Sequence, residues 1–507
     1  MGLRDFTLFD VIARNARLFG DRTAFVCDGR RISHGEHLER VERLAAGLAD
    51  AGIGIGDRVA VLAQNSLEYV DLYGAAARQG AIVLPINWRL GADEIAYAIA
   101  DGTPKMVVAG TDYAELIVSA RDKFPSVERY HAFGVAPAPF RPFDDLVGPA
   151  PSCPAADVPV DAGFVIIHTA AVGGRPRGAL ISHAGLLAAG LQLLCSWSLG
   201  PDDVNLGMLP LFHVSGLGLL LAVQQAGGST LVQRRFDPEA AVRHIEADKV
   251  TLFAEFPPML GALLDGAVKA GRDLSSLRVV TGLDSVETIN RFEACCPGAQ
   301  FWAVYGQSEL SGMATLAPFR DRPGSAGRPI LLTNVMVVDD LDHPLPAGQV
   351  GEIVVRGPTV FKGYWNCDAD NAQTFRGGWH HTGDMGRFDQ DGYLWYAGRS
   401  PAKELIKPGG ENVYPAEVEE VILGHPAIAE VAVFGVADAH WGEAVSALCV
   451  CRPGQTVSAE DLIEFVGSRL ARYKRPKHVI FASALPRTAA GAVDRARVKQ
   501  EHGAAGL

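Results

Sequence analysis

The stretch from Phe164 to His183 reads FVIIHTAAVGGRPRGALISH and predicts a strand, a loop and a helix in succession. Residues 164–167 form an apolar, β-branched run typical of a buried strand. The small residues that follow allow backbone N–H groups to approach phosphate oxygens, and Arg177 adds a forked cation suited to them. An ordinary glycine-rich connection is the alternative for this motif alone. A helix is expected to begin near Ser182.

Similar β-branched runs recur along the chain, and each is a candidate for a buried strand. They are residues 58–62 (RVAVL), 81–86 (AIVLPI), 106–109 (MVVA), 277–281 (LRVVT) and 300–305 (QFWAVY). Before the first run, Leu38, Val41, Leu44 and Leu48 keep one apolar helical face, and Gly52 follows as a stop. Alternating strand and helix signals predict an α/β fold with parallel sheets covered on both faces.

The chain length and two breaks in the pattern indicate how the protein is divided. A length of 507 residues suggests about three domain-sized units. The Pro- and Ala-rich segment 136–157 is expected to be a surface connection. The pattern breaks again at 400–403 (SPAK), and a small α/β unit follows. We therefore predict an N-terminal domain of residues 1–399 and a lid domain of residues 400–507.

Composition excludes several classes of function. The net charge is −12 and the pI is near 5.6, which opposes a broad nucleic-acid or anionic-membrane surface. The longest apolar run, residues 216–223, is too short to span a membrane. Charged residues interrupt the first 23 positions, so no export signal is expected and a cytoplasmic location is predicted. The eight cysteines show no C-x-x-C pair, which indicates reduced thiols and not a zinc site.

A second constellation is Tyr305-Gly306-Gln307-Ser308-Glu309, at the end of a predicted strand. Ligands bind at the carboxyl edge of open α/β sheets. A planar base could stack on Tyr305, while Ser308 and Glu309 could serve Mg²⁺ or the phosphates it bridges. A capped helix start beside a core tyrosine explains the same residues if they are taken alone.

Two later motifs are equally open when each is taken alone. In Thr382-Gly383-Asp384 the carboxylate could hold both ribose hydroxyls of a nucleotide, or it could simply form a turn. Residues 403–415 (KELIKPGGENVYP) would by themselves be a surface hairpin that opens a helix.

The ordered set of motifs closely resembles the acyl- and aryl-CoA synthetases of the adenylate-forming superfamily, such as fatty-acid:CoA and 4-coumarate:CoA ligases. The resemblance runs from Leu8 through Arg495. Its motifs are residues 210–216 (PLFHVSG), 305–309 (YGQSE), 351–353 (GEI), 362–365 (KGYW), 382–384 (TGD), 398–399 (GR), 409–415 (GGENVYP) and 486–488 (PRT).

This resemblance implies a fold, a reaction and a set of substrates. The fold would be a large multi-sheet N-terminal domain with a distorted β-barrel, plus a small mobile C-terminal α+β domain. The reaction would join a carboxylic acid to coenzyme A through an acyl-AMP, using ATP and Mg²⁺. The expected partners are small molecules, namely the carboxylic acid, ATP and CoA, with no nucleic acid and no membrane span. The site would supply positive charge and exclude water, because two anions meet at the α-phosphate.

The resemblance also implies roles for individual residues. Tyr305 would stack on adenine, Asp384 would hold the ribose, Arg399 would contact ribose or phosphate, and Glu309 would ligate Mg²⁺. The rest of the nucleotide site would be Thr169, Gly173, Gly174, Gly282, Leu283, Asp284, Gly306, Gln307 and Ser308. The lid would turn about Lys403 or its neighbours, and Gly409, Gly410, Glu411 and Asn412 would line the path of the CoA thiol.

Two departures from the family pattern bear on catalysis. In the phosphate loop Ala170, Ala171 and Val172 replace hydroxyl residues, and Arg177 stands in place of a lysine. Near the C-terminus Ala492 stands where the family lysine bridges the substrate carboxylate and the α-phosphate. Losing one such donor typically costs about 10²–10³ in rate, so adenylation is expected to be impaired. The substitution is either engineered or the mark of a natural pseudo-synthetase that binds adenylates without turnover.

The acyl pocket is expected to be largely apolar. By resemblance it would be lined by Phe212, His213, Val214, Leu217, Val304 and Met313, with His213 either gating or lining it. Without a cation placed for a second carboxylate, an aliphatic or aromatic monocarboxylic acid is expected. Loading of a carrier protein in place of CoA is the enzymatic alternative.

Overall fold

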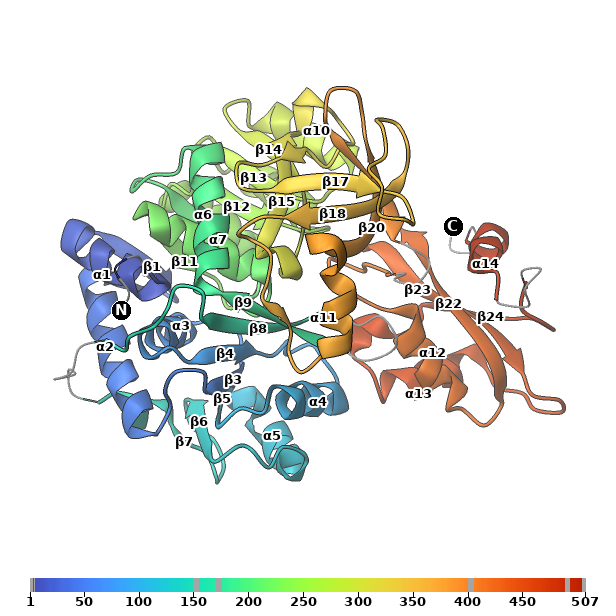
Figure 1. The fold of residues 1–507 in the computed structure, drawn as a ribbon, viewed down its shortest axis with the longest axis horizontal. Coiled ribbons are helices and arrows are strands. Elements are labelled where there is room, and N and C mark those ends of the chain that lie inside the picture. The colour runs from blue at the N-terminus through green and yellow to red at the C-terminus, as the bar shows by residue number, and fades with distance from the viewer. Residues whose placement is uncertain are drawn as a thin grey trace.

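Two large sheets, of eight and nine strands, make up most of the structure (Figure 1). The computed structural model describes residues 3, 5–148, 155–169, 176–399, 405–487 and 493–503. Parallel pairing dominates the centre of both sheets, as the alternating strand and helix signals predicted.

The eight-stranded sheet has the order β19-β9-β8-β4-β3-β5-β6-β7. Its strands are β3 (Arg58–Leu62), β4 (Ile82–Pro85), β5 (Met106–Gly110), β6 (Arg129–Phe133), β7 (Arg141–Pro142), β8 (Gly163–Thr169), β9 (Arg177–Ser182) and β19 (Gly363–Tyr364). In β3 the side chains of Val59 and Val61 enter one hydrophobic cluster and those of Ala60 and Leu62 another. The continuous apolar run was therefore a correct signal of a strand buried on both faces.

Helices cover both faces of this sheet. They are α1 (Leu8–Phe19), α2 (His34–Asp50) and α3 (Leu67–Gln79) on one side, and α4 (Ala92–Gly102) and α5 (Ala114–Ala120) on the other. The Ser33 side chain caps α2 by accepting the N–H of Glu36 at 3.1 Å, and the Glu36 carboxylate accepts the N–H of Ser33 in return. Gly52 follows α2 with φ of 76°, as expected of a helix stop.

The nine-stranded sheet has the order β16-β15-β14-β13-β12-β10-β11-β1-β2. Its strands are β1 (Thr23–Cys27), β2 (Arg30–Ser33), β10 (Val204–Gly207), β11 (Ser229–Val232), β12 (Leu252–Glu255), β13 (Val279–Gly282), β14 (Gln300–Gln307), β15 (Gly312–Pro318) and β16 (Arg328–Pro329). The accompanying helices are α6 (His183–Trp197), α7 (Val214–Ala226), α8 (Pro238–Ala247), α9 (Met259–Ala270) and α10 (Val286–Cys295). Helix α7 contributes Leu220 and Leu221 to the core of the first sheet and Leu219 and Val223 to that of the second. A helix enclosed in this way is apolar all round.

A smaller sheet of four strands lies beside the second large sheet (Figure 1). Its order is β17-β18-β20-β21, with β17 (Asn334–Val338), β18 (Gly351–Arg356), β20 (His380–Phe388) and β21 (Leu394–Arg399). Helix α11 (Asp368–Thr374) precedes β20. The expected barrel is not closed, because among the described strands β17 and β21 remain the two edges of an open sheet.

The C-terminal unit, which we call the lid, has its own sheet and two hydrophobic clusters. It comprises α12 (Pro415–Leu423), β22 (Ile428–Asp438), β23 (Gly442–Cys451), α13 (Ala459–Gly467), β24 (His478–Phe481) and α14 (Arg495–His502). Short 3₁₀ helices occur at Thr111–Tyr113, Arg121–Lys123, Phe143–Leu146, Ser308–Leu310, Phe319–Asp321, Arg376–Gly378 and Arg472–Lys474. In Figure 1 the lid occupies the right-hand side, with α14 at its upper edge.

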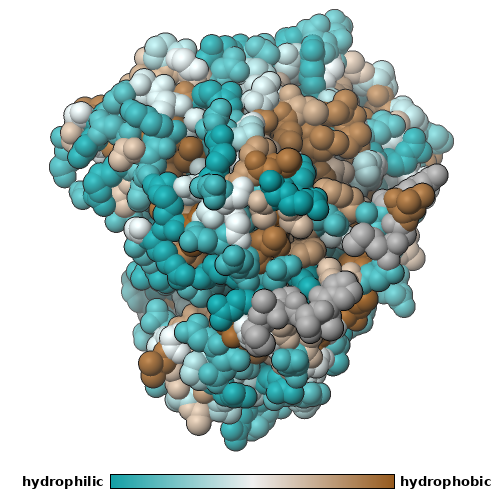
Figure 2. All heavy atoms as spheres, turned by 90° about the vertical axis from the view of Figure 1, so that its left-hand side faces the viewer, coloured by the Kyte–Doolittle hydropathy of each residue, from teal (hydrophilic) through white to brown (hydrophobic). Residues whose placement is uncertain are grey.

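The face in Figure 2 is mostly hydrophilic with one hydrophobic area, in keeping with the mixed composition of the chain. None of the helices in the described ranges is long and apolar enough to cross a membrane. The segment 136–157 is not purely a surface connection, because Phe143 and Leu146 are buried and pack in the core of the first sheet.

Candidate active site

Asp384 lies where three strands from two sheets meet. The Tyr305 hydroxyl, near the end of β14, donates a hydrogen bond to Oδ2 of Asp384 at 2.8 Å. Arg399, the last residue of β21, places its Nε 2.8 Å from Oδ1. The Asp384 side chain is almost fully buried. Three residues of the predicted nucleotide site are thus in direct contact.

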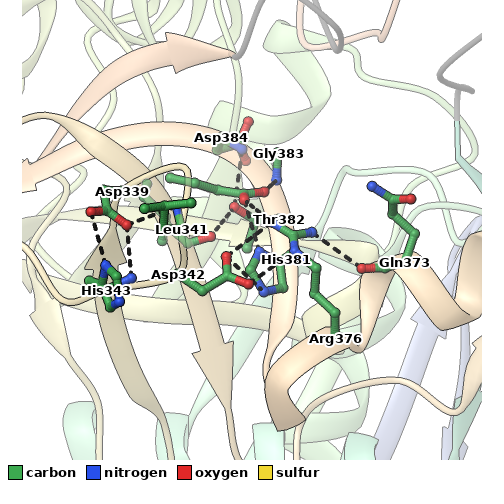
Figure 3. Close-up of polar contacts among 12 residues, drawn as sticks. Asp339, Leu341, Asp342, His343, Gln373, Arg376, His381, Thr382, Gly383 and Asp384 are labelled. Atoms are coloured by element: carbon green, nitrogen blue, oxygen red, sulfur yellow. Dashed lines mark hydrogen bonds and ion pairs between the residues drawn. The ribbon is translucent and has the colours of Figure 1, made fainter.

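A hydrogen-bond network holds the strand of Asp384 in place (Figure 3). Glu352 accepts the N–H of Gly383 at 2.8 Å, and its Oε2 lies 2.8 Å from His381 Nδ1 and 3.0 Å from Arg376. Burial alone would raise the pKa of Glu352, but these groups outweigh it and lower the pKa to about 2. The carboxylate stays ionised and fixes the backbone directly before Asp384.

Aromatic side chains form one wall beside the Asp384 carboxylate. The rings of Tyr305 and Tyr396 lie 6.2 Å apart and are tilted by 30°. Burial, followed by the nearby charge of Asp384, raises the pKa of Tyr305 well above its usual value, so the phenol remains a donor. Gln307 donates from Nε2 to the carbonyl of Thr382 at 3.2 Å and also to Asp384. A ring that entered here would meet flat aromatic surfaces.

The Glu309 carboxylate lies in a second group of polar side chains, which includes the predicted residues Thr169 and Arg177. Its Oε1 accepts hydrogen bonds from the Thr169 hydroxyl at 3.0 Å and the Tyr364 hydroxyl at 2.9 Å. Burial opposes ionisation, but His380 and these contacts outweigh it and lower the pKa of Glu309. The Arg177 guanidinium lies 3.8 Å from the centroid of the Tyr364 ring. Ser308 directly precedes Glu309 in a 3₁₀ turn. The ionised carboxylate of Glu309, the hydroxyls of Thr169 and Tyr364 and the cation of Arg177 therefore lie together.

The loop after β13 carries three further residues of the predicted nucleotide site, Gly282, Leu283 and Asp284. Gly282 has φ of 148°, and a Cβ there would lie 2.0 Å from the carbonyl oxygen of Glu255, so only glycine fits. Leu283 is exposed, and Asp284 accepts the N–H of Ser285 at 2.6 Å. Gly306 has a similar constraint, because a Cβ on it would lie 2.0 Å from a backbone oxygen of β15.

Glu255 was not predicted from the sequence and is fully buried beside Gly282. Across the described chain neither of its carboxyl oxygens has a hydrogen-bond partner of normal geometry, and the backbone N–H of Leu260 favours the charged form only weakly. Burial, reinforced by Asp284, raises the pKa of Glu255 well above its usual range. Burial therefore favours the neutral carboxylic acid at this position. An acid that ends the apolar run LFAE was the available signal.

The lid places a glycine loop against the body of the protein. Gly409 and Gly410 have φ of 57° and 83°, and a Cβ on Gly410 would lie 2.9 Å from Phe256. Glu411 reaches His213 Nε2 at 3.4 Å and accepts a hydrogen bond from Asn87 at 3.1 Å.

Arg89, which the sequence did not single out, also pairs with Glu411. Burial would raise the pKa of Glu411, but His213 and Arg89 lower it to about 2. Arg399 donates to the Tyr414 hydroxyl at 3.0 Å and so links Asp384 to the same loop. Asn412 follows Glu411 in this loop.

The six predicted acyl-pocket residues fall into three groups. Val304 and Met313 pack against one cluster together with Phe256, Trp197 and Trp302. The other members lie elsewhere: Val214 and Leu217 in the core of the first sheet, and Phe212 edge-on to Trp88, next to His213. Only the first group comes from strands next to Tyr305, with Val304 in β14 and Met313 in β15, but Tyr305 itself packs in a different cluster.

Four predicted residues lie outside the described parts of the chain. They are Gly173, Gly174, Lys403 and Ala492. Within the described ranges no group of three or more His, Cys, Asp or Glu side chains is placed to hold a metal ion. Oε2 of Glu309 is the oxygen best suited to Mg²⁺, because Oε1 accepts both hydrogen bonds.

Two sequence models of one enzyme family match most of this chain. The sequence model of the family described as AMP-binding enzyme matches residues 12–365, and that of the AMP-binding enzyme C-terminal domain matches residues 417–492. An indoleacetate–CoA ligase from Aromatoleum aromaticum is 36% identical over 501 residues, which cover 97% of this chain and 98% of that protein. A feruloyl-CoA synthase from an Amycolatopsis species is 34% identical over 495 residues, with coverage of 97% and 98%.

Solved structures lead to the same family. A Rhodopseudomonas palustris structure, provisionally assigned as a long-chain-fatty-acid CoA ligase, is 58% identical with a TM-score of 0.76 and covers 78% of this chain and 100% of its own. An o-succinylbenzoate CoA synthetase from Bacillus subtilis is 26% identical with a TM-score of 0.87, and 98% of each chain is covered. The chain therefore belongs to the AMP-binding enzyme family, as an adenylate-forming acyl- or aryl-CoA synthetase.

Proposed function

We propose that this chain activates an apolar monocarboxylic acid in two steps. The acid's carboxylate oxygen attacks the α-phosphorus of ATP, pyrophosphate leaves, and an acyl-AMP forms. The CoA thiolate then attacks the acyl carbonyl and AMP leaves. The observation that carries the proposal is the contact of Asp384 with both Tyr305 and Arg399, beside the lid loop.

Each part of this site has a proposed role in the first step. Asp384 would accept the ribose hydroxyls while Tyr305 and Tyr396 present ring faces to adenine. Arg177 would supply positive charge toward the phosphates. Glu309 would hold Mg²⁺, which when bound neutralises phosphate charge. The ionised state of Glu309 fits a magnesium ligand.

The lid loop has a proposed role in the second step. Gly409 and Gly410 let the loop backbone lie directly against Trp441 and Phe256, and the proposed path of the CoA thiol runs along this loop, where no side chain of these two residues obstructs it. Glu411, held by His213 and Arg89, would keep the loop in place. We propose that the lid comprises residues 400–507 and moves about the region of Lys403.

We propose an aromatic acid as the first substrate to test, with an aliphatic acid as the alternative. Val304 and Met313 pack with two indole rings and Phe256, and such flat surfaces suit an aromatic ring. Relatives named as feruloyl-CoA synthase and indoleacetate–CoA ligase support this order. Turnover of a panel of aromatic and aliphatic acids, followed as acyl-CoA formation, tests it.

Ala492 is proposed to slow the first step, since the family lysine is replaced there. An engineered substitution is one explanation, and a natural adenylate-binding protein without turnover is the other. The Ala492→Lys variant separates the two explanations. If turnover is gained, the substitution at position 492 is the cause of the low activity; if it is not, a binding role is favoured. Transfer to a carrier protein is a further alternative, supported by a 31% identical relative named as a fatty acid–[acyl-carrier-protein] ligase from Streptomyces coeruleorubidus. A cytoplasmic location remains a prediction from the sequence.

A further inference from the structure

A buried cluster of charged groups joins the lid to the body away from the nucleotide site. Lys474 of the lid is 2% exposed, and its Nζ lies 2.7 Å from Oε1 of Glu417 in α12. The same Nζ pairs with Glu94, which belongs to α4 of the body. The side chains of both glutamates are nearly buried. A lysine from one unit is therefore enclosed between a carboxylate of its own unit and one of the other.

The charges of Lys474, Glu417 and Glu94 stabilise one another. Burial alone would lower the pKa of Lys474, but Glu417 and Glu94 outweigh it and raise the pKa, so the ammonium is charged at neutral pH. Buried charged groups such as Lys474 and its two glutamates are stable only while each keeps a partner. Contacts of this kind favour one arrangement over others more than they add stability.

Glu94 has two partners in the lid and one in its own helix. Its Oε2 accepts the N–H of Ala471 at 2.9 Å across the interface, while Oε1 pairs with Lys474. Oε2 also accepts the N–H of Gly91 at 2.8 Å, which caps α4. If the lid moved away, Lys474 would keep Glu417 and Glu94 would keep Gly91. The cluster can thus open without stranding a buried charge.

The lid orientation that forms this cluster also presents the glycine loop to the site. Glu411 contacts His213 and Gly410 lies against Phe256 in the same arrangement. Arg487 and Arg495, which flank the segment containing Ala492, bond to Glu430 and Glu419 within the lid. Helix α14 lies on the side of the lid away from the body (Figure 1). The described arrangement therefore presents the glycine loop to the site, as the proposed transfer to CoA requires.

We propose that Glu94, through Lys474 and the N–H of Ala471, holds the lid in the orientation that transfers the acyl group to CoA. Glu94 is then a positioning residue for the second half-reaction. The inference rests on the proposed function, because it assigns the described lid orientation to that step.

The test separates the two half-reactions. The full chain receives synthetic acyl-AMPs and CoA, and acyl-CoA formation is timed; this step bypasses position 492. Glu94→Gln keeps an acceptor for the Gly91 N–H but loses the charge, and transfer should slow about tenfold. Asp93→Asn is the matched control on the same turn of α4, since Asp93 pairs only with Lys123 of the body in the described structure, and its rate should be unchanged. Pyrophosphate release without CoA, measured in the Ala492→Lys background, should not fall in Glu94→Gln.

A second readout does not depend on activity. Hydrogen exchange of the Ala471 amide should become faster in Glu94→Gln, while the amides of α4 and of the lid sheet keep their protection. Equal transfer rates and equal Ala471 exchange in wild type and Glu94→Gln would overturn the inference. If the wild type transfers no acyl group from acyl-AMP to CoA, the proposed function fails instead, and the Ala471 exchange still decides whether Glu94 holds the lid.

Discussion

Tyr305 and Asp384 stand 79 residues apart in the chain, and the Tyr305 hydroxyl donates a 2.8 Å hydrogen bond to Oδ2 of Asp384. The tyrosine comes from the nine-stranded sheet and the aspartate from the four-stranded sheet. The bond therefore joins two separately built layers at the point where a nucleotide is proposed to bind.

Replacing Asp384 tests that point. Asp384→Asn removes the charge that faces Arg399 and halves the acceptor capacity offered to the ribose, so ATP affinity should fall about tenfold to a hundredfold. Titration calorimetry with ATP measures the change. Tyr305→Phe keeps the ring and removes only the hydroxyl, so its loss should be several-fold smaller. Equal ATP affinity in Asp384→Asn and wild type would remove Asp384 from the nucleotide site.

Glu309 should determine the response to magnesium. Mg²⁺ is expected to strengthen ATP binding by the wild type, because the ionised carboxylate shares the ion with the phosphates. In Glu309→Gln this enhancement should be largely lost, while binding of ATP without metal stays the same or improves. The measurement is ATP affinity across a magnesium titration. An undiminished magnesium effect in Glu309→Gln would refute the assignment.

The glycine loop of the lid should tolerate no side chain. Gly410→Ala places a Cβ 2.9 Å from Phe256 in a left-handed backbone, so acyl transfer from synthetic acyl-AMP should fall at least tenfold. Gly378→Ala is a matched control, since Gly378 has φ of 76° and open space around it. That variant should lose about 1 kcal/mol of stability but keep its transfer rate. Similar transfer rates in the two variants would contradict the role of the loop.

Stability should fall in mild acid because of a buried histidine. Burial lowers the pKa of His183 from 6.5 to about 4, so the native protein holds it neutral. As pH falls below 6.5, the unfolded chain binds a proton that the native state refuses until about pH 4. The free energy of unfolding should therefore decrease by roughly 1 kcal/mol per pH unit across this window from this group.

The matched variant for this effect is His183→Gln, with urea unfolding followed from pH 7 to 5. Its stability should depend less on pH than that of the wild type, although its value at pH 7 is lower. An identical pH slope in both proteins would show that His183 titrates normally in the native state.

Central strands could be predicted from the sequence because both of their faces are buried. The run at Arg58–Leu62 became β3 with the same ends, and Ser182 capped a helix where expected. The burial of Phe143 in segment 136–157 was harder to predict, because the proline- and alanine-rich composition of this segment is typical of a surface loop. A local pattern reports burial only where it repeats over several residues.

The candidate site was predicted from the order of several motifs along the chain, and not from the spacing of residues within any one motif. Thr169, Arg177 and Glu309 do meet, but around Tyr364, whose position depends on a strand that pairs across a distant part of the chain. Glu255 was missed because a buried acid contradicts the hydrophobic pattern that surrounds it. The contacts of Glu94 with the lid depend on two surfaces that only the folded chain brings together.

The most direct measurement is the release of AMP and the formation of acyl-CoA by the protein with Ala492 and by its Ala492→Lys variant. Both forms receive ATP, Mg²⁺, CoA and a panel of aromatic and aliphatic carboxylic acids. The account predicts that the lysine form turns over at least one acid about 10²–10³ times faster than the alanine form, and that AMP and acyl-CoA appear in equal amounts. If neither form releases AMP with any acid, the synthetase function is contradicted and an adenylate-binding protein without turnover takes its place.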